Sequence, residues 1–289
     1  MTGDLATGDP VTGDPVTGVP APGRARRRAQ RLSSYAADYA ADYGFESVLV
    51  RYRHRLVADL VRDLRPATVV EVGCGLDLLV DAVRHLETRV GTRFFGRWVV
   101  VEPDPAFAAP AEAAARSDAR LAVVRGFAED AVGEVARRLG PGNVADLVVC
   151  ASLLHELDDP ARVLGAVRSL SGPATVVHVS VPNAGSLHRR LARSMGLIGD
   201  VHQPSERNRR FGQPHVFDRD SLAATLASAG FDIVRTGGAF VKPFDHRHME
   251  QVPFLTPDLL DGLYELGREL PELAAEIYAD ARLAAPAPP

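Results

Sequence analysis

Cysteine and lysine are almost missing from this chain of 289 residues, and it has no long apolar run. Its two cysteines, Cys74 and Cys150, are too few for a disulfide framework or a zinc ligand set. Lys242 is the only lysine among 33 basic residues, which we attribute to a GC-rich genome and not to chemistry. No apolar stretch approaches the roughly 20 residues that span a bilayer, and the N-terminus has no signal-peptide core. We therefore expect a cytoplasmic protein that does not bind membranes.

The net charge is also small. A formal value of −4 gives no reason to expect general affinity for nucleic acid. A hydrophobic content of 46% is ordinary for a globular protein, and the length allows one large α/β core. The first residues repeat Thr-Gly-Asp-Pro and have little to bury. We expect a disordered low-complexity tail at 1–23, an N-terminal helical cap at 24–66, the main domain at 67–244 with an insertion at about 183–215, C-terminal helices at 245–284, and a disordered tail at 285–289.

The most informative stretch lies at residues 68–86. Thr68 to Val72 form a β-branched run of strand length, a turn with Gly73 and Gly75 follows, and apolar side chains then repeat at helical spacing. Strand, glycine turn and helix open a doubly wound sheet, in which ligands bind beyond the carboxyl ends of the strands. A glycine has no Cβ, so the backbone of this turn can approach a ligand closely.

Strands and helices continue to alternate along the main domain, which predicts a parallel sheet. A hairpin is expected from 231–236 and 239–241 because Gly237-Gly238 joins them, and 257–278 is expected to form one or two helices. The other expected elements are strands at 97–102, 121–124, 145–150 and 175–181 and helices at 46–64, 160–170, 183–195 and 222–229.

Two classes of ligand use a glycine turn after the first strand and an acid after the second. A dinucleotide needs a third glycine where its pyrophosphate meets the helix, but Leu78 occupies that position. Asp77 would repel a phosphate, whereas Asp77 and Glu71 suit a cofactor with a sulfonium and an amino group. Glu102, at the end of the second strand, can accept hydrogen bonds from both hydroxyls of a ribose. The pattern therefore disfavours a dinucleotide.

These motifs resemble those of class I S-adenosylmethionine-dependent methyltransferases, of the bacterial small-molecule type near the ubiquinone and secondary-metabolite enzymes. The resemblance covers about residues 45–240. It implies an α/β fold: a Rossmann-like seven-stranded sheet with an N-terminal helical cap and an insertion after strand five. The matching stretches are Glu71-Val72-Gly73-Cys74-Gly75, Val101-Glu102-Pro103-Asp104, Gly126-Phe127-Ala128-Glu129-Asp130 and residues 146–155.

The resemblance implies S-adenosylmethionine as the cofactor. Gly73 and Gly75 would back its methionine part and Glu102 its ribose. Phe127 would flank the adenine, although core packing explains this residue equally well. The residues expected to bind the cofactor are Glu71, Gly73, Cys74, Gly75, Asp77, Glu102, Pro103, Gly126, Phe127, Ala128, Ala151, Ser152 and Leu153.

An oxygen or nitrogen acceptor must lose a proton, and two histidines are the catalytic candidates. His155 comes just after strand four, beside the expected methyl group, and histidine titrates near neutral pH. A structural role for His155 is the alternative. His215 lies at the end of the insertion. The residues expected to bind the acceptor, from the helical cap and the insertion, are Tyr39, Tyr43, Arg51, Asn183 and His188.

The segment from Asp245 to Glu250 contains His246 and His248 and has metal-binding residue types. Because no third ligand can be assigned, we favour a surface loop and expect no metal.

The expected function is methylation of oxygen or nitrogen on a small-molecule acceptor, in secondary-metabolite or glycan-type biosynthesis. Two alternatives stay open. One is an enzyme that uses S-adenosylmethionine without transferring methyl, such as a cyclase or lyase acting on its aminobutyrate chain. The other is a non-catalytic cofactor-binding partner of another enzyme. A homodimer is also left open.

Overall fold

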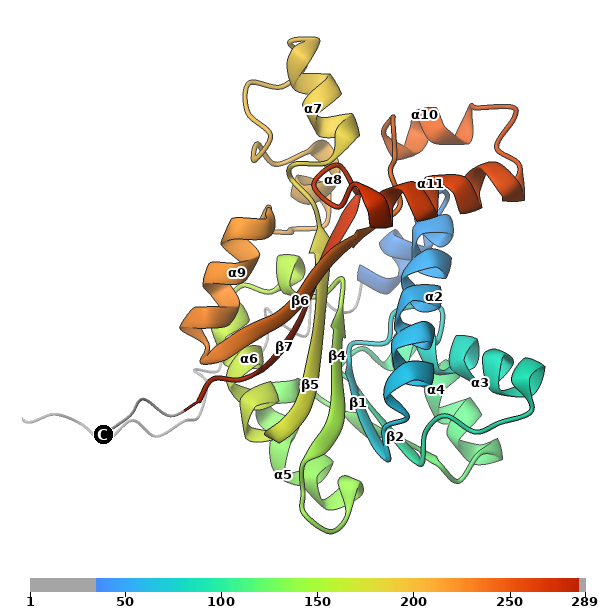
Figure 1. Cartoon of the computed structure of the whole chain (residues 1–289), viewed down its shortest axis with the longest axis vertical. Helices are drawn as coiled ribbons and strands as arrows, with labels where there is room; N and C mark the ends of the chain where they lie inside the picture. The colour runs from blue at the N-terminus through green and yellow to red at the C-terminus, as the bar shows by residue number, and fades with distance from the viewer. Residues whose placement is uncertain (1–34, 286–289) are drawn as a thin grey trace, which may run out of the picture.

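The computed structural model describes residues 35–285. The tail expected at 1–23, the first residues of the helical cap and residues 286–289 lie outside this range. Within it, one seven-stranded sheet has the order β3-β2-β1-β4-β5-β7-β6 (Figure 1). The strands are β1 (Thr68–Val72), β2 (Arg97–Glu102), β3 (Leu121–Arg125), β4 (Ala145–Ala151), β5 (Ser171–Pro182), β6 (Phe231–Ala239) and β7 (Glu276–Leu283).

Neighbouring strands run parallel except where β7 takes part. β7 is antiparallel to both β5 and β6, so β6 points in the same direction as β5 and ends at the same edge of the sheet. The parallel pairs join β1 to β2 and β4, β2 to β3, and β4 to β5. The predicted Rossmann-like seven-stranded sheet is therefore confirmed.

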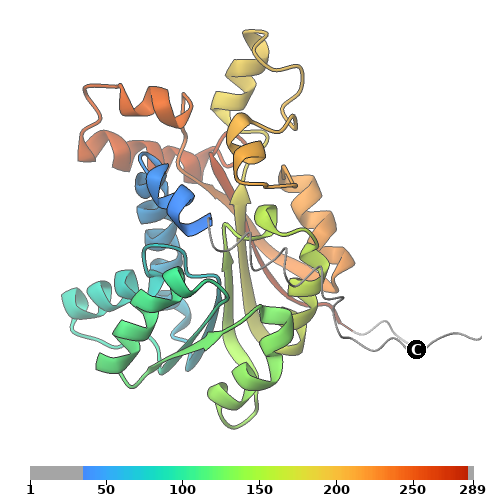
Figure 2. The same cartoon turned by 180° about the vertical axis from the view of Figure 1, so that it is seen from behind.

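Helices cover both faces of the sheet, and the result is three layers (Figures 1 and 2). Side chains of a strand alternate between its faces, so Val70 and Val148 enter one core while Val69 and Leu147 enter the other. The first core is closed by α5 (Ala128–Leu139), α6 (Pro160–Ser169) and α9 (Arg219–Ser228), and the second by α2 (Glu46–Leu64), α3 (Leu79–Val90) and α4 (Pro105–Ser117).

Two helices that follow strand ends begin with the same device. The side chain of Asp104 accepts a hydrogen bond from Ala106 N at the start of α4, and Asp159 accepts one from Ala161 N at the start of α6. A proline follows each aspartate at the first helical position, where its missing N–H costs nothing. These caps fix the points at which the chain leaves the carboxyl edge of the sheet.

Two expectations for the C-terminal part were wrong. The pair Gly237-Gly238 does not form a hairpin turn, because β6 runs through it. A Cβ on Gly238 would lie 2.6 Å from the Cβ of Ala274 and 2.8 Å from the Cα of Pro271, so this glycine serves close packing. Residues 276–283 form β7 and not helix. Ile277, Ala279 and Ala281 enter the same core at every second position, the spacing of a strand.

The remaining elements gather at the carboxyl edge of the sheet, which is at the top in Figure 1. Residues 35–41 are helical, and α7 (Leu187–Ser194) and α8 (Glu206–Arg210) form the predicted insertion after β5. Arg207 of α8 makes an ion pair with Asp42, which ties the insertion to the N-terminal segment. α10 (His246–Glu250) and α11 (Pro257–Glu269) complete this end.

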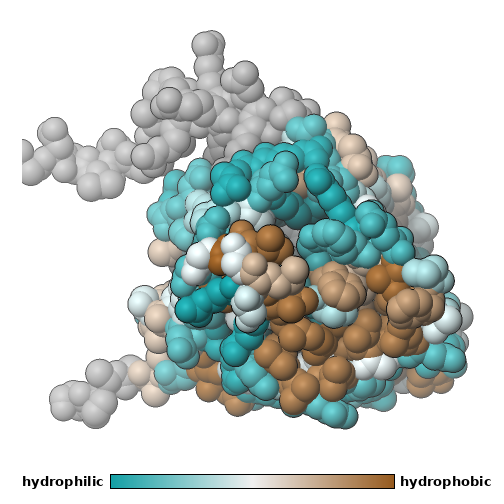
Figure 3. Space-filling view, turned by 90° about the horizontal axis from the view of Figure 1, so that it is seen from above, coloured by the Kyte–Doolittle hydropathy of each residue, from teal (hydrophilic) through white to brown (hydrophobic). Residues whose placement is uncertain are grey.

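Viewed onto this end, the surface is divided: hydrophilic side chains lie along one side of the face and apolar ones along the opposite side (Figure 3). Exposed apolar side chains on or next to these elements include Met195, Leu197, Phe254 and Leu266. No helix among the described residues has the length and apolarity to cross a membrane.

Candidate functional site

A cavity of about 700 Å³ opens at the carboxyl ends of β1, β2 and β4, and we call it the strand-end cavity. The chain order of the sheet reverses between β1 and β4. In doubly wound sheets this switch point is where ligands bind, because the connections leave it on opposite faces.

The predicted cofactor residues converge on this cavity, with one exception. Gly126 does not line it, and its N–H donates to the carbonyl oxygen of Glu102 (3.2 Å). The predicted residues that line the cavity are Glu71, Gly73, Cys74, Gly75, Asp77, Glu102, Pro103, Phe127, Ala128, Ala151, Ser152 and Leu153.

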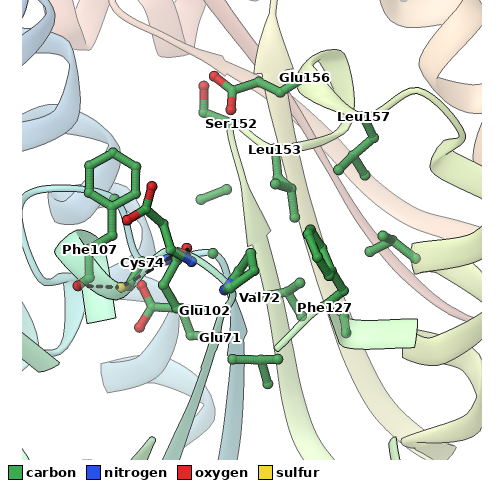
Figure 4. A pocket seen from close by; sticks show the side chains of 18 of the residues that line it. Glu71, Val72, Cys74, Glu102, Phe107, Phe127, Ser152, Leu153, Glu156 and Leu157 are labelled. Carbon is green, nitrogen blue, oxygen red and sulfur yellow. Dashed lines mark hydrogen bonds between the residues drawn. The ribbon is translucent and has the colours of Figure 1, made fainter. Parts of the chain in front are cut away.

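Glu102 has a fixed carboxylate. One oxygen accepts a hydrogen bond from Cys74 N (3.1 Å) and the other from Asp104 N (2.8 Å), so both strand ends orient it. Burial raises its pKa to about 6, and the two backbone donors oppose this rise. The group is therefore ionised above pH 6. Figure 4 shows Cys74 and Glu102 on one side of the cavity and Phe127 on the other.

The glycine turn leaves room beside the backbone. Gly73 and Gly75 have φ of +77° and +62°, which residues with a Cβ rarely adopt. A Cβ on Gly75 would meet no atom of the described residues within 4 Å, and one on Gly73 would touch only Leu153, at 3.5 Å. This open cradle beside a fixed carboxylate fits a nucleoside with an amino-acid chain.

The two acids of the turn differ in environment. Glu71 is buried and accepts a hydrogen bond from the indole N–H of Trp98 (2.8 Å), and burial raises its pKa to about 8. Its carboxyl group is therefore largely protonated at pH 7. Asp77 is exposed, lines the cavity and accepts a hydrogen bond from the hydroxyl of Tyr43 (2.6 Å). Asp77 is the better counter-charge for a cationic ligand.

Three tyrosines cover the cavity from the N-terminal segment. Tyr35, Tyr39 and Tyr43 all line it, and neighbouring rings lie with centroids 5.7 and 5.6 Å apart. The guanidinium of Arg207 lies 5.7 Å from the ring of Tyr39 and 4.8 Å from that of Phe211. The N-terminal segment and the insertion therefore form one roof, which includes the predicted Tyr39 and Tyr43.

His155 stands behind the wall of the cavity. It is buried and does not line the cavity, and its Nδ1 has no hydrogen-bond partner among residues 35–285. Burial, aided by the charges of Arg53 and Arg207, lowers its pKa to about 3, so the ring is neutral at pH 7. Its Nε2 lies 3.8 Å from Oε1 of Glu156, which does line the cavity.

The other predicted acceptor-site residues lie outside the strand-end cavity. Arg51 is exposed, with its guanidinium 5.0 Å from the ring of Tyr52. Asn183 is buried and donates to the carbonyl oxygens of Glu272 and Ala274, which is a structural role.

His188 and His215 each have a buried ring nitrogen without a hydrogen bond among the described residues. The backbone N of His215 lies 3.5 Å from the carbonyl oxygen of His155, so the two catalytic candidates are neighbours.

Several cavity residues were not predicted from the sequence, among them Glu156, Tyr35 and Arg53. Glu156 accepts hydrogen bonds from Tyr35 and from Nε2 of Gln213 (3.1 Å), and its position next to His155 was a usable signal. Tyr35 precedes Tyr39 and Tyr43 at intervals of four residues, which places the three on one face of a helix. Arg53 lies seven residues after Glu46, on the same face of α2, and the two are 3.2 Å apart. The spacing of opposite charges could have revealed this pair.

The cysteines and the histidine-rich segment show no metal geometry. No group of three or more His, Cys, Asp or Glu side chains within residues 35–285 is placed to hold a metal ion. Nδ1 of His248 pairs with Asp245 (2.8 Å). Cys74 and Cys150 are free and belong to cores on opposite faces of the sheet.

The sheet order, the antiparallel β7 and the strand-end cavity define the class I methyltransferase fold, whose cofactor is S-adenosylmethionine. A sequence model of the methyltransferase domain family matches residues 46–236, and the chain belongs to this family.

Solved structures resemble the fold at low sequence identity. One is a chain from a complex that contains the Haloferax volcanii Trm112 methyltransferase activator: TM-score 0.55, 16% identity, covering 88% of this chain and 98% of that one. Another is a DUF574 family protein from Streptomyces avermitilis: TM-score 0.53, 14% identity, covering 88% and 90%. No curated protein matches the sequence. These likenesses bear on the fold alone.

Proposed function

We propose that the protein is an enzyme that transfers a methyl group from S-adenosylmethionine to oxygen or nitrogen of a small molecule. The observation that carries this proposal is Glu102, whose carboxylate is held by two backbone donors at the wall of the strand-end cavity. Two fixed acceptor oxygens match the two hydroxyls of a ribose. We also propose that this methylation belongs to secondary-metabolite or glycan-type biosynthesis.

The other cofactor contacts follow from the same wall. Gly73 and Gly75 lie along the methionine part, because glycines without a Cβ let a ligand approach the turn closely. Asp77 pairs with the amino group, and Phe127 flanks the adenine. When bound, S-adenosylmethionine supplies a methyl group on a sulfonium, an electrophile that needs no further activation.

The roof supports a small acceptor. Tyr35 and Tyr39 line the cavity, Phe211 of the insertion packs against both rings, and the ion pair of Arg207 with Asp42 holds the two parts of the roof together. The acceptor must therefore be small enough to fit under this roof or at its edge. Because in-line transfer depends on alignment, holding the acceptor against the cofactor accounts for much of the rate.

Glu156 is the group best placed to receive the proton of the acceptor. Its carboxylate faces the cavity near the end of β4, above Ser152 in Figure 4. Tyr35 and Gln213 orient it. His155, neutral and 3.8 Å behind it, acts as a positioning residue. His215 supports His155 from the insertion.

The products of an incubation with S-adenosylmethionine test the proposal against its alternatives. Formation of S-adenosylhomocysteine that depends on an added acceptor supports methyl transfer. Methylthioadenosine formed without any acceptor would indicate a cyclase or lyase. Binding of the cofactor without any turnover across an acceptor panel would favour a non-catalytic partner.

A further inference from the structure

Lys242, the only lysine of the chain, lies just beyond β6 and has 4% of its surface exposed. Because β6 runs parallel to β5, Lys242 is at the same edge of the sheet as the strand-end cavity. The backbone before it is held in place, since Val241 N donates to Leu263 O (2.8 Å) and Ala275 N donates to Phe240 O (2.7 Å). The backbone position from which the Lys242 side chain extends is therefore fixed.

No carboxylate among the described residues makes a hydrogen bond or an ion pair with Lys242. Its acidic neighbours are engaged elsewhere. Glu46 pairs with Arg53 at 3.2 Å, and Asp245 pairs with Nδ1 of His248 at 2.8 Å. A buried ammonium that no carboxylate contacts directly is costly, and burial lowers the pKa of Lys242 to about 7, although the charges of Glu46 and Asp245 oppose this shift. An anion beside it would restore the charged form.

Two imidazole rings next to Lys242 also have nitrogens without partners. Nδ1 of His188, on α7, and Nδ1 of His246, on α10, are buried and make no hydrogen bond within residues 35–285. Burial, and after it the charge of Lys242, lowers the pKa of both rings, that of His246 to about 2. A buried polar atom that loses its hydrogen bonds to water without gaining others destabilises the fold. We call Lys242, His188 and His246 the Lys242 cluster; its two imidazole nitrogens without hydrogen bonds could be satisfied by a bound ligand.

The Lys242 cluster is connected to the strand-end cavity through charged side chains. Arg53 lines the cavity and lies 3.2 Å from Glu46, and Glu46 lies 3.9 Å from Nε2 of His246. α7 and α10 stand on either side of the end of β6 in both views (Figures 1 and 2). A molecule that extends from the cavity past Arg53 and Glu46 would reach the cluster.

The charges select the kind of group that fits. Arg53 Nε donates to both oxygens of Glu276 (2.7 and 2.8 Å), and Arg207 is paired with Asp42, so neither arginine is left for a ligand. Lys242 supplies a positive charge that no carboxylate contacts directly, and the nearby Glu46 and Asp245 disfavour a second negative charge on the ligand. A carboxylate matches this site better than a doubly charged phosphate.

We infer that the Lys242 cluster binds a carboxylate group of the methyl acceptor, with the ammonium as counter-ion and the two imidazole rings as hydrogen-bond partners. The inference rests on the proposed function, since it requires an acceptor at the strand-end cavity. It assigns the acceptor to organic acids whose carboxylate is remote from the oxygen or nitrogen that receives the methyl group.

NMR can observe Lys242 alone, because lysine labelled with carbon-13 at Cε gives one resonance in this chain. The full chain, saturated with S-adenosylhomocysteine, is titrated with pH in the presence of benzoate or of benzamide, which has a similar shape without the charge. Benzoate is expected to raise the pKa of Lys242 by about one unit, equivalent to roughly tenfold tighter binding to the protonated form. Benzamide is expected to leave it unchanged. The other groups that face Lys242 and set the background titration are Glu46 of α2, His188 and Arg189 of α7, Arg207 of α8, and Asp245 and His246 of α10.

Two variants complete the test. Lys242→Met keeps an apolar stem and is expected to weaken benzoate binding about tenfold or more, with unchanged affinity for S-adenosylhomocysteine, as measured by calorimetry. Arg247→Met removes an exposed charge on α10 and should bind benzoate like the wild type. A Lys242 titration that benzoate does not alter, or that benzamide alters equally, overturns the inference. Failure of S-adenosylhomocysteine to bind would instead contradict the proposed function.

Discussion

Replacement of Glu102 by glutamine should remove most of the affinity for S-adenosylhomocysteine. Glutamine has nearly the same shape but only one acceptor oxygen. Its NH₂ group would face one of the two backbone donors, Cys74 N or Asp104 N, that now hold the carboxylate. The side chain must therefore turn or lose a hydrogen bond, and it can no longer accept from both hydroxyls of a ribose.

The expected loss can be estimated from the hydrogen bonds. A hydrogen bond to a charged group contributes about 1.5–3 kcal/mol and one between neutral groups about 0.5–1.5 kcal/mol. Losing one ribose bond and the charge of the other therefore costs about 2.5–4.5 kcal/mol, and affinity should fall roughly fiftyfold to a thousandfold at about 1.4 kcal/mol per tenfold change. Because burial raises the pKa of Glu102 to about 6, wild-type affinity should also decline as the pH falls through 6 and the carboxylate is protonated.

Isothermal titration calorimetry with S-adenosylhomocysteine is the assay, and thermal denaturation verifies that the variant folds. Glu112→Gln, in an exposed ion pair with Arg125 on α4 and β3, is the matched control and should bind like the wild type. A Glu102→Gln variant that folds and binds within about threefold of the wild type, a difference below about 1 kcal/mol, would show that Glu102 does not hold the ribose.

Four further substitutions probe other parts of the site. Gly75→Ala should weaken binding of S-adenosylhomocysteine, because a Cβ would enter the cavity. The control Gly91→Ala, at the end of α3, should cost only about 1–2 kcal/mol of stability from its positive φ and leave the affinity unchanged. Equal affinities for the two variants would argue against the glycine cradle. Glu156→Gln should lower kcat without changing cofactor affinity. His155→Ala should lower kcat by a smaller factor and alter the dependence of kcat on pH. Unchanged turnover in both variants would show that Glu156 and His155 have structural roles only. Glu71, with a pKa raised to about 8 from 4.5, holds a proton in the folded protein that the unfolded chain has lost, so stability should fall as the pH rises between these values. Glu71→Gln should remove that decline, and a Tm difference from the wild type that stays constant between pH 5 and pH 8 would contradict it.

The sheet and the cofactor side of the cavity could be predicted because their signals are local. β1, β2 and β4 are continuous β-branched or apolar runs, and each is followed directly by the residues that line the cavity. Once the order of parallel strands is accepted, the positions of Gly73, Glu102 and Ser152 follow from chain geometry.

The C-terminal strand was missed because its signal is weak. In β7, alanine occupies two of the buried alternate positions, and alanine favours helices more than strands. Ile277 is the only β-branched residue in β7, and one such residue does not predict a strand that pairs with β5 and β6. Gly237-Gly238 was misread because a glycine needed for close packing looks the same in sequence as one needed for a turn.

The acceptor side could not be predicted because it depends on contacts between segments far apart in the chain. Arg53 meets Glu276, and Arg207 meets Asp42, only after folding. Lys242 was explained as an effect of base composition. Its burial beside two neutral histidines is a property of the tertiary structure alone.

A crystal structure of the full chain with S-adenosylhomocysteine tests the central claim most directly. We expect the nucleoside in the strand-end cavity, with both ribose hydroxyls within hydrogen-bond distance of the Glu102 carboxylate and the amino-acid chain beside Gly73 and Asp77. A nucleoside bound elsewhere, or bound in this cavity with its ribose away from Glu102, would contradict it.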